Sequence, residues 1–258
     1  MAKKMIQPPG VFAHSRTGNG ALYAVMPPEG VLESRMPNFE RTKICVLTSP
    51  HRGSRFAQIL LEMSEDGGMV APRLDRVQHF FYVVEGDAVL EMAGETHALT
   101  AGAFAYAPAG TSLRLRSGAG RTANVMWIQK PYEAVEGIAP PAAFVGHADQ
   151  VEKVNKHTQG RTWQHLLPDS DLAFDFAVNI LAFEPGNYFP MVETHVMEHG
   201  LYMLEGQGMY LLEKDWHECW AGDFIWMGPY CPQFFYATGW QTASYLLYKD
   251  VNRDIAFA

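Results

Sequence analysis

The sequence predicts an all-β protein built from two tandem antiparallel β-barrels of the jelly-roll type. The first observation behind this prediction is a succession of short apolar runs, broken by Gly, Pro, Asn or charged residues, from Thr42 onward. Such spacing is typical of β-sandwiches and barrels. The second is an internal repeat at an offset of about 120 residues, which indicates duplicated domains. The third is that no segment shows the period of a long amphipathic helix.

The apolar runs fall into two groups that define the predicted strands. The first group is 44–47, 56–63, 79–84, 88–92 and 103–107, and the second is 174–183, 199–205, 209–212, 224–227, 234–237 and 243–248. A less regular stretch around 131–149 separates them. We therefore predict an N-terminal arm with one or two short strands over 1–40, a first barrel domain over 41–135, a linker over 136–165 and a second barrel domain over 166–258.

The internal repeat needs no gap over its matching positions. Glycines recur in both copies where we expect hairpins to turn, and glycine tolerates the backbone conformations that tight turns require. The aligned landmarks are His79 with His199, Tyr82 with Tyr202, Glu85-Gly86 with Glu205-Gly206, Ala101-Gly102 with Ala221-Gly222, Phe104 with Phe224, and Thr122-Ala123 with Thr242-Ala243.

Composition limits the classes of function. With 258 residues, 48% of them hydrophobic, the chain can bury a sizeable core, and its net charge of -8 argues against nucleic acid or an anionic membrane as partner. The three cysteines, Cys45, Cys219 and Cys231, form no CxxC pair, so neither a disulfide framework nor a thiolate zinc site is expected. The sequence has no signal-peptide pattern and no long apolar run. We therefore expect a cytoplasmic protein.

A candidate metal site lies in the second copy. Glu193, His195 and His199 are all odd-numbered, so in one extended strand their side chains would point to the same side. A turn after the following hydrophobic strand would return Gln233 to the same pocket. Two imidazoles, a carboxylate and an amide carbonyl suit a divalent first-row cation such as Mn²⁺, Fe²⁺, Ni²⁺ or Zn²⁺. Taken alone, the two histidines could equally be ordinary half-buried residues.

The first copy favours the metal interpretation by contrast. At the four aligned positions it has Arg73, Asp75, His79 and Leu113. A guanidinium and an aliphatic side chain cannot bind a cation, so we predict that the first copy keeps the scaffold and has lost the site. His79 is then expected to be structural.

The two glycine-anchored blocks, present twice, resemble the two motifs of the cupin superfamily, and the whole chain resembles a bicupin. In the usual first motif a His-x-His pair precedes an acidic ligand and then a Gly. Here the positions hold Glu193, His195, His199 and Gly206, so Glu and His have exchanged places. In the second motif, Gly222-Asp223 is followed by Gln233 where a ligand His is usual.

This combination resembles the (S)-ureidoglycine aminohydrolase family. The resemblance is carried by the string from Glu193 to Gly200, the run from Leu204 to Tyr210 and the tail from Tyr245 to Asp254. It implies hydrolysis of (S)-ureidoglycine to (S)-ureidoglycolate and ammonia with bound Mn²⁺, in allantoin and purine breakdown. It also implies that Glu193, His195, His199 and Gln233 bind the metal, and that Tyr210, Tyr245 and Lys249 contact the substrate.

The residues themselves support two of these substrate contacts. Tyr245 and Lys249 have the same parity on one terminal strand, so both can face the barrel interior. We predict Lys249 as a general base or proton shuttle, Tyr245 as an orienting hydroxyl and Glu193 as a further catalytic group. The first copy has Leu90, Val125 and Gln129 at the positions of Tyr210, Tyr245 and Lys249. The alternative is that Lys249 extends to the rim and Tyr245 fills core.

Two other classes of function stay open at this point. One is a different metal-dependent cupin enzyme, a dioxygenase or isomerase, and the other is a non-catalytic ligand-binding bicupin. The sequence does not decide whether water attacks the substrate directly or adds to an imine. A small-molecule substrate and a homo-oligomer are expected, since bicupins usually associate through their sheet faces.

Overall fold

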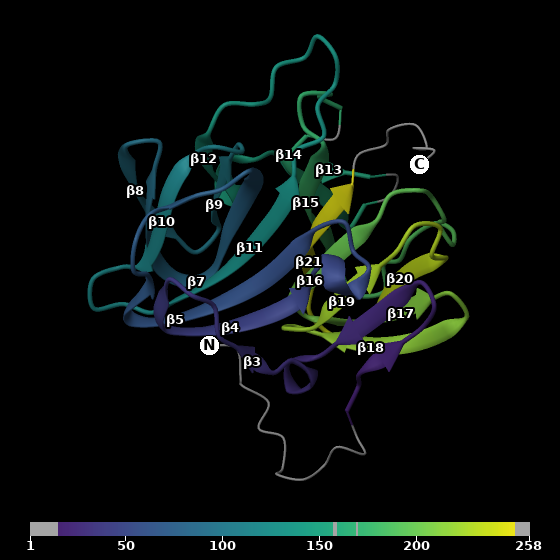
Figure 1. The fold of residues 1–258 in the computed structure, drawn as a ribbon. Coiled ribbons are helices and arrows are strands. Elements are labelled where there is room, and N and C mark those ends of the chain that lie inside the picture. Colours follow the sequence, from purple (N-terminus) through teal and green to yellow (C-terminus); the bar gives the residue numbers. More distant parts are fainter. Residues whose placement is uncertain (1–14, 157–158, 169, 251–258) are drawn as a thin grey trace.

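The computed structural model describes residues 15–156, 159–168 and 170–250 and has the predicted all-β architecture. Figure 1 shows two β-barrels side by side, the first in blue and teal and the second in green and yellow, with purple strands of the arm against the second. Among the residues that the structure describes, three short 3₁₀ helices interrupt the strands: η2 (Pro28–Gly30), η3 (Pro50–Arg52) and η4 (Ala148–Gln150). Within the described ranges, no helix has the length and apolar character needed to cross a membrane.

The first barrel is formed by one ten-stranded sheet. Its strands are β3 (Glu33–Ser34), β4 (Phe39–Thr48), β5 (Ala57–Met69), β6 (Arg73–Leu74), β7 (Val77–Met92), β8 (Glu95–Thr100), β9 (Ala103–Ala107), β10 (Ser112–Ser117), β11 (Ala123–Pro131) and β12 (Phe144–His147). Strand β7 is central, because it pairs with β8, β9, β10 and β11.

The second barrel combines an eight-stranded and a three-stranded sheet, ordered β1-β2-β19-β16-β21-β15-β14-β13 and β18-β17-β20. The strands are β1 (Gly18–Asn19), β2 (Tyr23–Met26), β13 (Val154–Asn155), β14 (Arg161–Leu167), β15 (Phe176–Phe183), β16 (His199–Glu205), β17 (Gln207–Leu212), β18 (Asp215–Trp220), β19 (Phe224–Met227), β20 (Gln233–Ala237) and β21 (Ala243–Asp250). Adjacent β16 and β21 carry His199 and Lys249.

Strand registers reproduce the offset of 120 residues found in the sequence. Pairs of residues that face each other across strands of the first barrel have counterparts, 120 positions later, that face each other in the second. Such pairs are Phe81–Trp127 and Leu201–Leu247, Tyr82–Phe104 and Tyr202–Phe224, and Arg73–Leu113 and Glu193–Gln233. The alignment of the two copies therefore holds in three dimensions, including at the candidate site.

The central strands are apolar on both faces because each face is buried. In β7, Phe81 packs inside the first barrel, whereas the adjacent Phe80 packs between the two barrels. In β16, Leu201 lies inside the second barrel and Tyr202 between the barrels. Continuous apolar runs are typical of strands covered on both sides. One face of β16 therefore looks into the second barrel and the other toward the first.

The repeated glycines mark two different features. Gly102 and Gly222, with φ of 89° and 94°, lie in turns between consecutive strands, as predicted. The expected hairpins at Gly86 and Gly206 are wrong: β7 continues through Gly86, and the chain bends there from one sheet neighbour to another. These residues also have positive φ, and a Cβ on either would overlap a backbone carbonyl. Glycine is therefore required at the bend.

Some segments differ from the prediction. The described part of the arm has three strands of its own, β1, β2 and β3, rather than one or two. Strand β2 pairs with β19 of the second barrel, so the arm joins the sheet that carries the candidate site. The stretch taken as a linker contains β12, β13 and part of β14, which join the sheets of the two barrels. The exact domain boundaries stay a prediction, and residues 1–14 and 251–258 lie outside the described residues.

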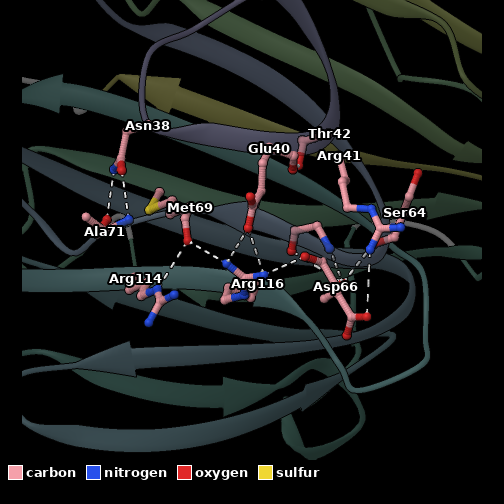
Figure 2. Close-up of polar contacts among 12 residues, drawn as sticks. Asn38, Glu40, Arg41, Thr42, Ser64, Asp66, Met69, Ala71, Arg114 and Arg116 are labelled. Carbon is pink, nitrogen blue, oxygen red and sulfur yellow. Dashed lines mark hydrogen bonds and ion pairs between the residues drawn. The ribbon is translucent and has the colours of Figure 1, made fainter.

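Two arginines of β10 bind the β4–β5 hairpin of the first barrel (Figure 2). The Arg116 guanidinium donates to the Glu40 carboxylate at 3.2 Å and to the Met69 carbonyl at 3.1 Å. Arg114 donates to the same Met69 carbonyl at 3.1 Å. These side-chain contacts join the long β4–β5 hairpin to β10.

Candidate functional site

The candidate metal residues meet at the end of the second barrel where β16 begins. Strand β16 starts at His199, and an irregular segment with a bend at Val196 precedes it. The prediction that one extended strand carries Glu193, His195 and His199 is therefore wrong. Glu193 instead forms an isolated bridge with Gln233, through backbone hydrogen bonds of 2.8 and 2.9 Å. The bend still brings both imidazoles together.

The two imidazoles face each other through their Nε2 atoms, which are 3.2 Å apart. The Nδ1 of His195 lies 3.1 Å from the Met197 carbonyl oxygen, and the Nδ1 of His199 lies 3.2 Å from that of Tyr248. A carbonyl oxygen only accepts hydrogen bonds, so each Nδ1 carries the hydrogen and each Nε2 exposes a lone pair. This is the arrangement by which histidines present Nε2 to a metal.

Both histidines are neutral at physiological pH. Burial lowers the pKa of His199 to about 3, and burial together with the nearby Lys249 charge lowers the pKa of His195. Two lone pairs 3.2 Å apart, with no proton between them, repel each other unless an electrophile lies at their meeting point. The donor set therefore fits a divalent cation.

Gln233 completes the observed cluster. It is buried, and its side-chain amide nitrogen lies 2.8 Å from the Nε2 of His195, where it donates to the imidazole lone pair. The oxygen and nitrogen of an amide exchange places by a simple rotation, so the group can present its carbonyl to the same point. Among the residues that the structure describes, no three His, Cys, Asp or Glu side chains are placed to hold a metal. The Glu193 carboxylate as fourth ligand stays a prediction.

Two tyrosines lie within electrostatic range of Glu193. Tyr210 on β17 and Tyr245 on β21 lie inside the second barrel, almost fully buried, and hydrogen-bond to each other. Burial raises the pKa of both hydroxyls, and the charge of Glu193 raises them further. Both groups therefore keep their protons and can donate hydrogen bonds. Tyr245 faces the barrel interior, the side that its parity indicates.

Lys249 lies beside the imidazoles. It faces His199 directly across the β16–β21 pair and is half-buried. Its charge contributes to the lowered pKa of both histidines, so the ammonium group lies within electrostatic range of them. The terminal strand thus brings a cationic side chain and a tyrosine hydroxyl toward the histidine cluster.

Sequence reasoning missed Arg161 near this site. The side chain is buried, donates at 2.9 Å to the Lys156 carbonyl and stacks on the Phe189 ring. Its pKa is lowered by burial, while the Glu193 charge opposes that effect. Arg161 begins β14, inside the stretch assigned as linker, and the first copy also has an arginine there, Arg41. The contrast between the copies therefore gave no signal.

In the first copy a different cluster fills the aligned positions. Arg73 forms an ion pair with Asp75 and lies over the Trp127 ring, 4.8 Å from its centroid. The Trp127 indole N–H donates to the Nδ1 of His79 at 3.1 Å. His79 is 1% exposed. A guanidinium thus stands at the position of Glu193, and His79 has the packed surroundings of a structural residue.

His79 predicts a pH-dependent stability that can be measured. Burial, aided by Arg73, lowers its pKa to about 4. Below pH 6.5 the unfolded chain takes up a proton that the folded chain refuses until about pH 4, so stability falls as the pH drops through this window. Between pH 7 and 4.5, the free energy of unfolding of metal-stripped wild type, measured with urea, should fall by about 2 kcal/mol more than that of His79→Gln. Equal losses would contradict this origin.

A hollow of about 570 Å³ lies away from the histidine cluster. Residues of the arm and the first barrel line it, including Met26, Thr48 and Arg52, together with Trp226. None of the predicted site residues contributes to its lining.

Comparisons with known proteins agree with this architecture. The cupin domain family matches residues 60–129. The (S)-ureidoglycine aminohydrolase of Escherichia coli K12 is 33% identical over 237 residues, which cover 90% of each chain. A probable (S)-ureidoglycine aminohydrolase of rice is 36% identical over 233 residues, which cover 90% of this chain and 74% of the relative.

A solved structure is similar over almost the whole chain. The putative glyoxylate-induced protein of Pseudomonas aeruginosa superposes with a TM-score of 0.87 at 35% identity, covering 95% of this chain and 93% of that one. Both barrels and their connection are thus shared with that protein. Together with the identity to curated relatives over nine-tenths of the sequence, this likeness shows that the chain belongs to the (S)-ureidoglycine aminohydrolase family of bicupins.

Proposed function

We propose that this protein hydrolyses (S)-ureidoglycine to (S)-ureidoglycolate and ammonia, as a step in allantoin and purine breakdown. The observation that carries the proposal is the meeting of two imidazole lone pairs 3.2 Å apart beside Gln233 and Lys249. Relatives that are named for this activity and share a third of their residues with the chain support it.

The proposed cofactor is Mn²⁺, one per chain, held by His195, His199 and Gln233 with Glu193 as the fourth ligand. The mixed nitrogen and oxygen donors suit this ion, although the same donors accept other first-row cations. When bound, a divalent cation supplies a fixed positive charge that anchors an anionic or amine group of the substrate and polarises it.

The substrate has an amine, a carboxylate and a ureido nitrogen on one carbon, so it can expel ammonia. In our proposal the Lys249 ammonium donates a proton to the departing amine, and the neutral amine that remains accepts a proton from the incoming water. Tyr210 and Tyr245, whose hydroxyls stay protonated, donate hydrogen bonds that orient the carboxylate or ureido group. Fixing one face of the reacting carbon makes the replacement of amine by hydroxyl stereospecific.

The test is ammonia release from freshly generated (S)-ureidoglycine. Wild-type protein loaded with Mn²⁺ should release ammonia well above the spontaneous rate, with one ureidoglycolate formed per ammonia. Oxygen consumption without ammonia release would favour a dioxygenase, and tight binding of the substrate without turnover would favour a ligand-binding protein. Either result overturns the proposal.

We further propose that the protein forms a homo-oligomer through the outer face of the β18-β17-β20 sheet. An outer face of an antiparallel sheet is usually polar, yet Trp216 is 53% and Tyr236 39% exposed here. The first barrel has polar residues at most of the aligned positions. The second-barrel residues and their counterparts are Met209 and Val89, Leu211 and Glu91, Trp216 and Thr96, Phe234 and Arg114, and Tyr236 and Arg116.

Light scattering tests this association. Wild type should have a mass of at least twice the 28.8 kDa of one chain. The Phe234→Arg/Tyr236→Arg variant, which has the arginines of the first barrel at these positions, should have a smaller mass than wild type. Val89→Arg, on the corresponding face of the first barrel, is the control and should keep the wild-type mass. A wild-type monomer would refute the proposal.

A further inference from the structure

The two barrels are joined by a polar network that repeats about the same offset of 120 residues. Each barrel supplies one residue that reaches across to the other and binds the side chains of two adjacent strands there. Arg55 of the first barrel binds Glu198 and Asp250 of the second, and Asp175 of the second binds Gln78 and Lys130 of the first. We call each of these residues, together with its two partners in the other barrel, a clamp. Adding 120 to 55, 78 and 130 gives 175, 198 and 250, so the two clamps occupy equivalent positions.

The clamp on the second barrel begins at Arg55. Its backbone N–H donates to both carboxylate oxygens of Glu198, at 3.2 and 3.0 Å, and its guanidinium donates at 2.9 Å to Asp250. Glu198 also accepts from the Trp226 indole at 2.6 Å. The other arm of the guanidinium donates to Glu133 at 2.7 Å. Glu198 and Asp250 are both buried, so these donors replace the water that the carboxylates have lost.

The clamp on the first barrel has the opposite polarity. Gln78 donates to Asp175 at 2.5 Å and accepts from the Tyr106 hydroxyl at 2.9 Å, where the second barrel has Glu198 and Trp226. Lys130 donates to Asp175 at 2.7 Å. The two clamps are thus equivalent in position and differ in what lies beside them, because only one of the two flanks the candidate metal residues.

The neighbours of the clamped residues carry the predicted chemistry. Glu198 immediately precedes His199, and Asp250 immediately follows Lys249. The Asp250 N–H donates to the Glu198 carbonyl at 3.0 Å, which closes the β16–β21 pair at this end. Adjacent residues in a strand point to opposite faces. His199 and Lys249 therefore look into the second barrel while Glu198 and Asp250 look toward Arg55.

We infer that Arg55, a residue of the first barrel, positions His199 and Lys249 of the second. Its three bonds fix the start of β16, where an irregular segment enters the strand, against the end of β21. The first barrel then has a part in the reaction although its own ligand positions hold Arg73 and Leu113. Arg55 is 52% exposed at its side chain, so its replacement is compatible with folding. The test of this inference has two readouts. The first, kcat, rests on the proposed function, and the second, the affinity for Mn²⁺, rests on metal binding.

The experiment compares Arg55→Met with Asp175→Asn, the equivalent position of the other clamp. Arg55→Met removes the guanidinium bond to Asp250 and keeps the backbone N–H bonds to Glu198. With the end of β21 released, it should weaken binding of Mn²⁺ to metal-stripped protein about tenfold and lower kcat at saturating Mn²⁺ about tenfold, the usual scale for groups that orient ligands. Arg55→Lys, which keeps the charge, should recover part of both losses. Asp175→Asn should lower the melting temperature while Mn²⁺ affinity and kcat stay near wild type.

A second comparison tests whether Arg55 acts through Asp250. If it does, the double variant Arg55→Met/Asp250→Asn should lower kcat by less than the product of the fold reductions of the two single variants. Wild-type Mn²⁺ affinity and kcat in Arg55→Met would overturn the inference, and so would equal losses in Asp175→Asn. If wild type releases no ammonia from (S)-ureidoglycine, the proposed function fails, whereas the Mn²⁺ comparison still decides whether Arg55 positions His199.

Discussion

Replacing Lys249 by Met should leave the metal content near that of wild type and lower kcat by roughly 10² to 10⁴, the range for losing a general acid or base. Methionine keeps the length and apolar stem of the side chain but has no amine. Lys249 faces His199 across β16 and β21, so its removal takes away the proton carrier of our proposal and leaves the imidazoles in place. Metal analysis together with steady-state kinetics measures both effects.

Gln233→Leu is the matched comparison and should fail differently. The first copy has leucine, Leu113, at the position aligned with Gln233. We therefore expect β20 to accommodate a leucine there. This variant should bind Mn²⁺ more weakly, and its activity should recover as Mn²⁺ is raised, because Lys249 is intact. If excess Mn²⁺ rescues Lys249→Met, or if that variant turns over normally with stereospecific product, Lys249 is a rim residue and has no catalytic role.

Removing both imidazoles should abolish metal binding and activity together. Wild type should bind one equivalent of metal per chain, because the first copy has a guanidinium and an aliphatic side chain at two of the four aligned positions. His195→Ala/His199→Ala deletes the two lone pairs that meet at 3.2 Å. We expect its metal content to fall to background and kcat to fall at least as far as in Lys249→Met.

The control for this variant is His79→Ala in the first barrel. That residue aligns with His199 but accepts a hydrogen bond from the Trp127 indole, so its loss should lower stability and leave the metal content at one equivalent. Two equivalents of metal in wild type, or metal that survives the double replacement, would refute a single site in the second barrel.

Much of the fold could be predicted because the repeat and the apolar runs are local or periodic features of the sequence. The predicted runs 199–205 and 224–227 coincide with β16 and β19, and the offset of 120 reappears in the strand registers. Strand β10 was missed because it alternates apolar Leu113 and Leu115 with Arg114 and Arg116. Its apolar residues are never adjacent, although alternation is itself a strand signal.

The candidate site could be predicted in part for the same reason. The contrast between the copies indicated His195, Gln233 and Lys249, and the spacing of the motif added His199. The structure brings these residues together. The contrast could not indicate Arg55, because the two residues of the second barrel that Arg55 binds, Glu198 and Asp250, lie more than 140 positions away in the chain. Contacts of this kind depend on how the two barrels dock, and neither periodicity nor motif spacing encodes that arrangement.

The most direct test of the central claim is the stereochemistry of the product. Mn²⁺-loaded wild type should convert freshly generated ureidoglycine to a single enantiomer, (S)-ureidoglycolate, with one ammonia released per molecule and a rate well above the spontaneous decay. Chiral separation at early times, before ureidoglycolate decays, measures the ratio of enantiomers. A racemic product formed at the uncatalysed rate would contradict the account, because the second barrel would then neither bind one face of the substrate nor carry its proton.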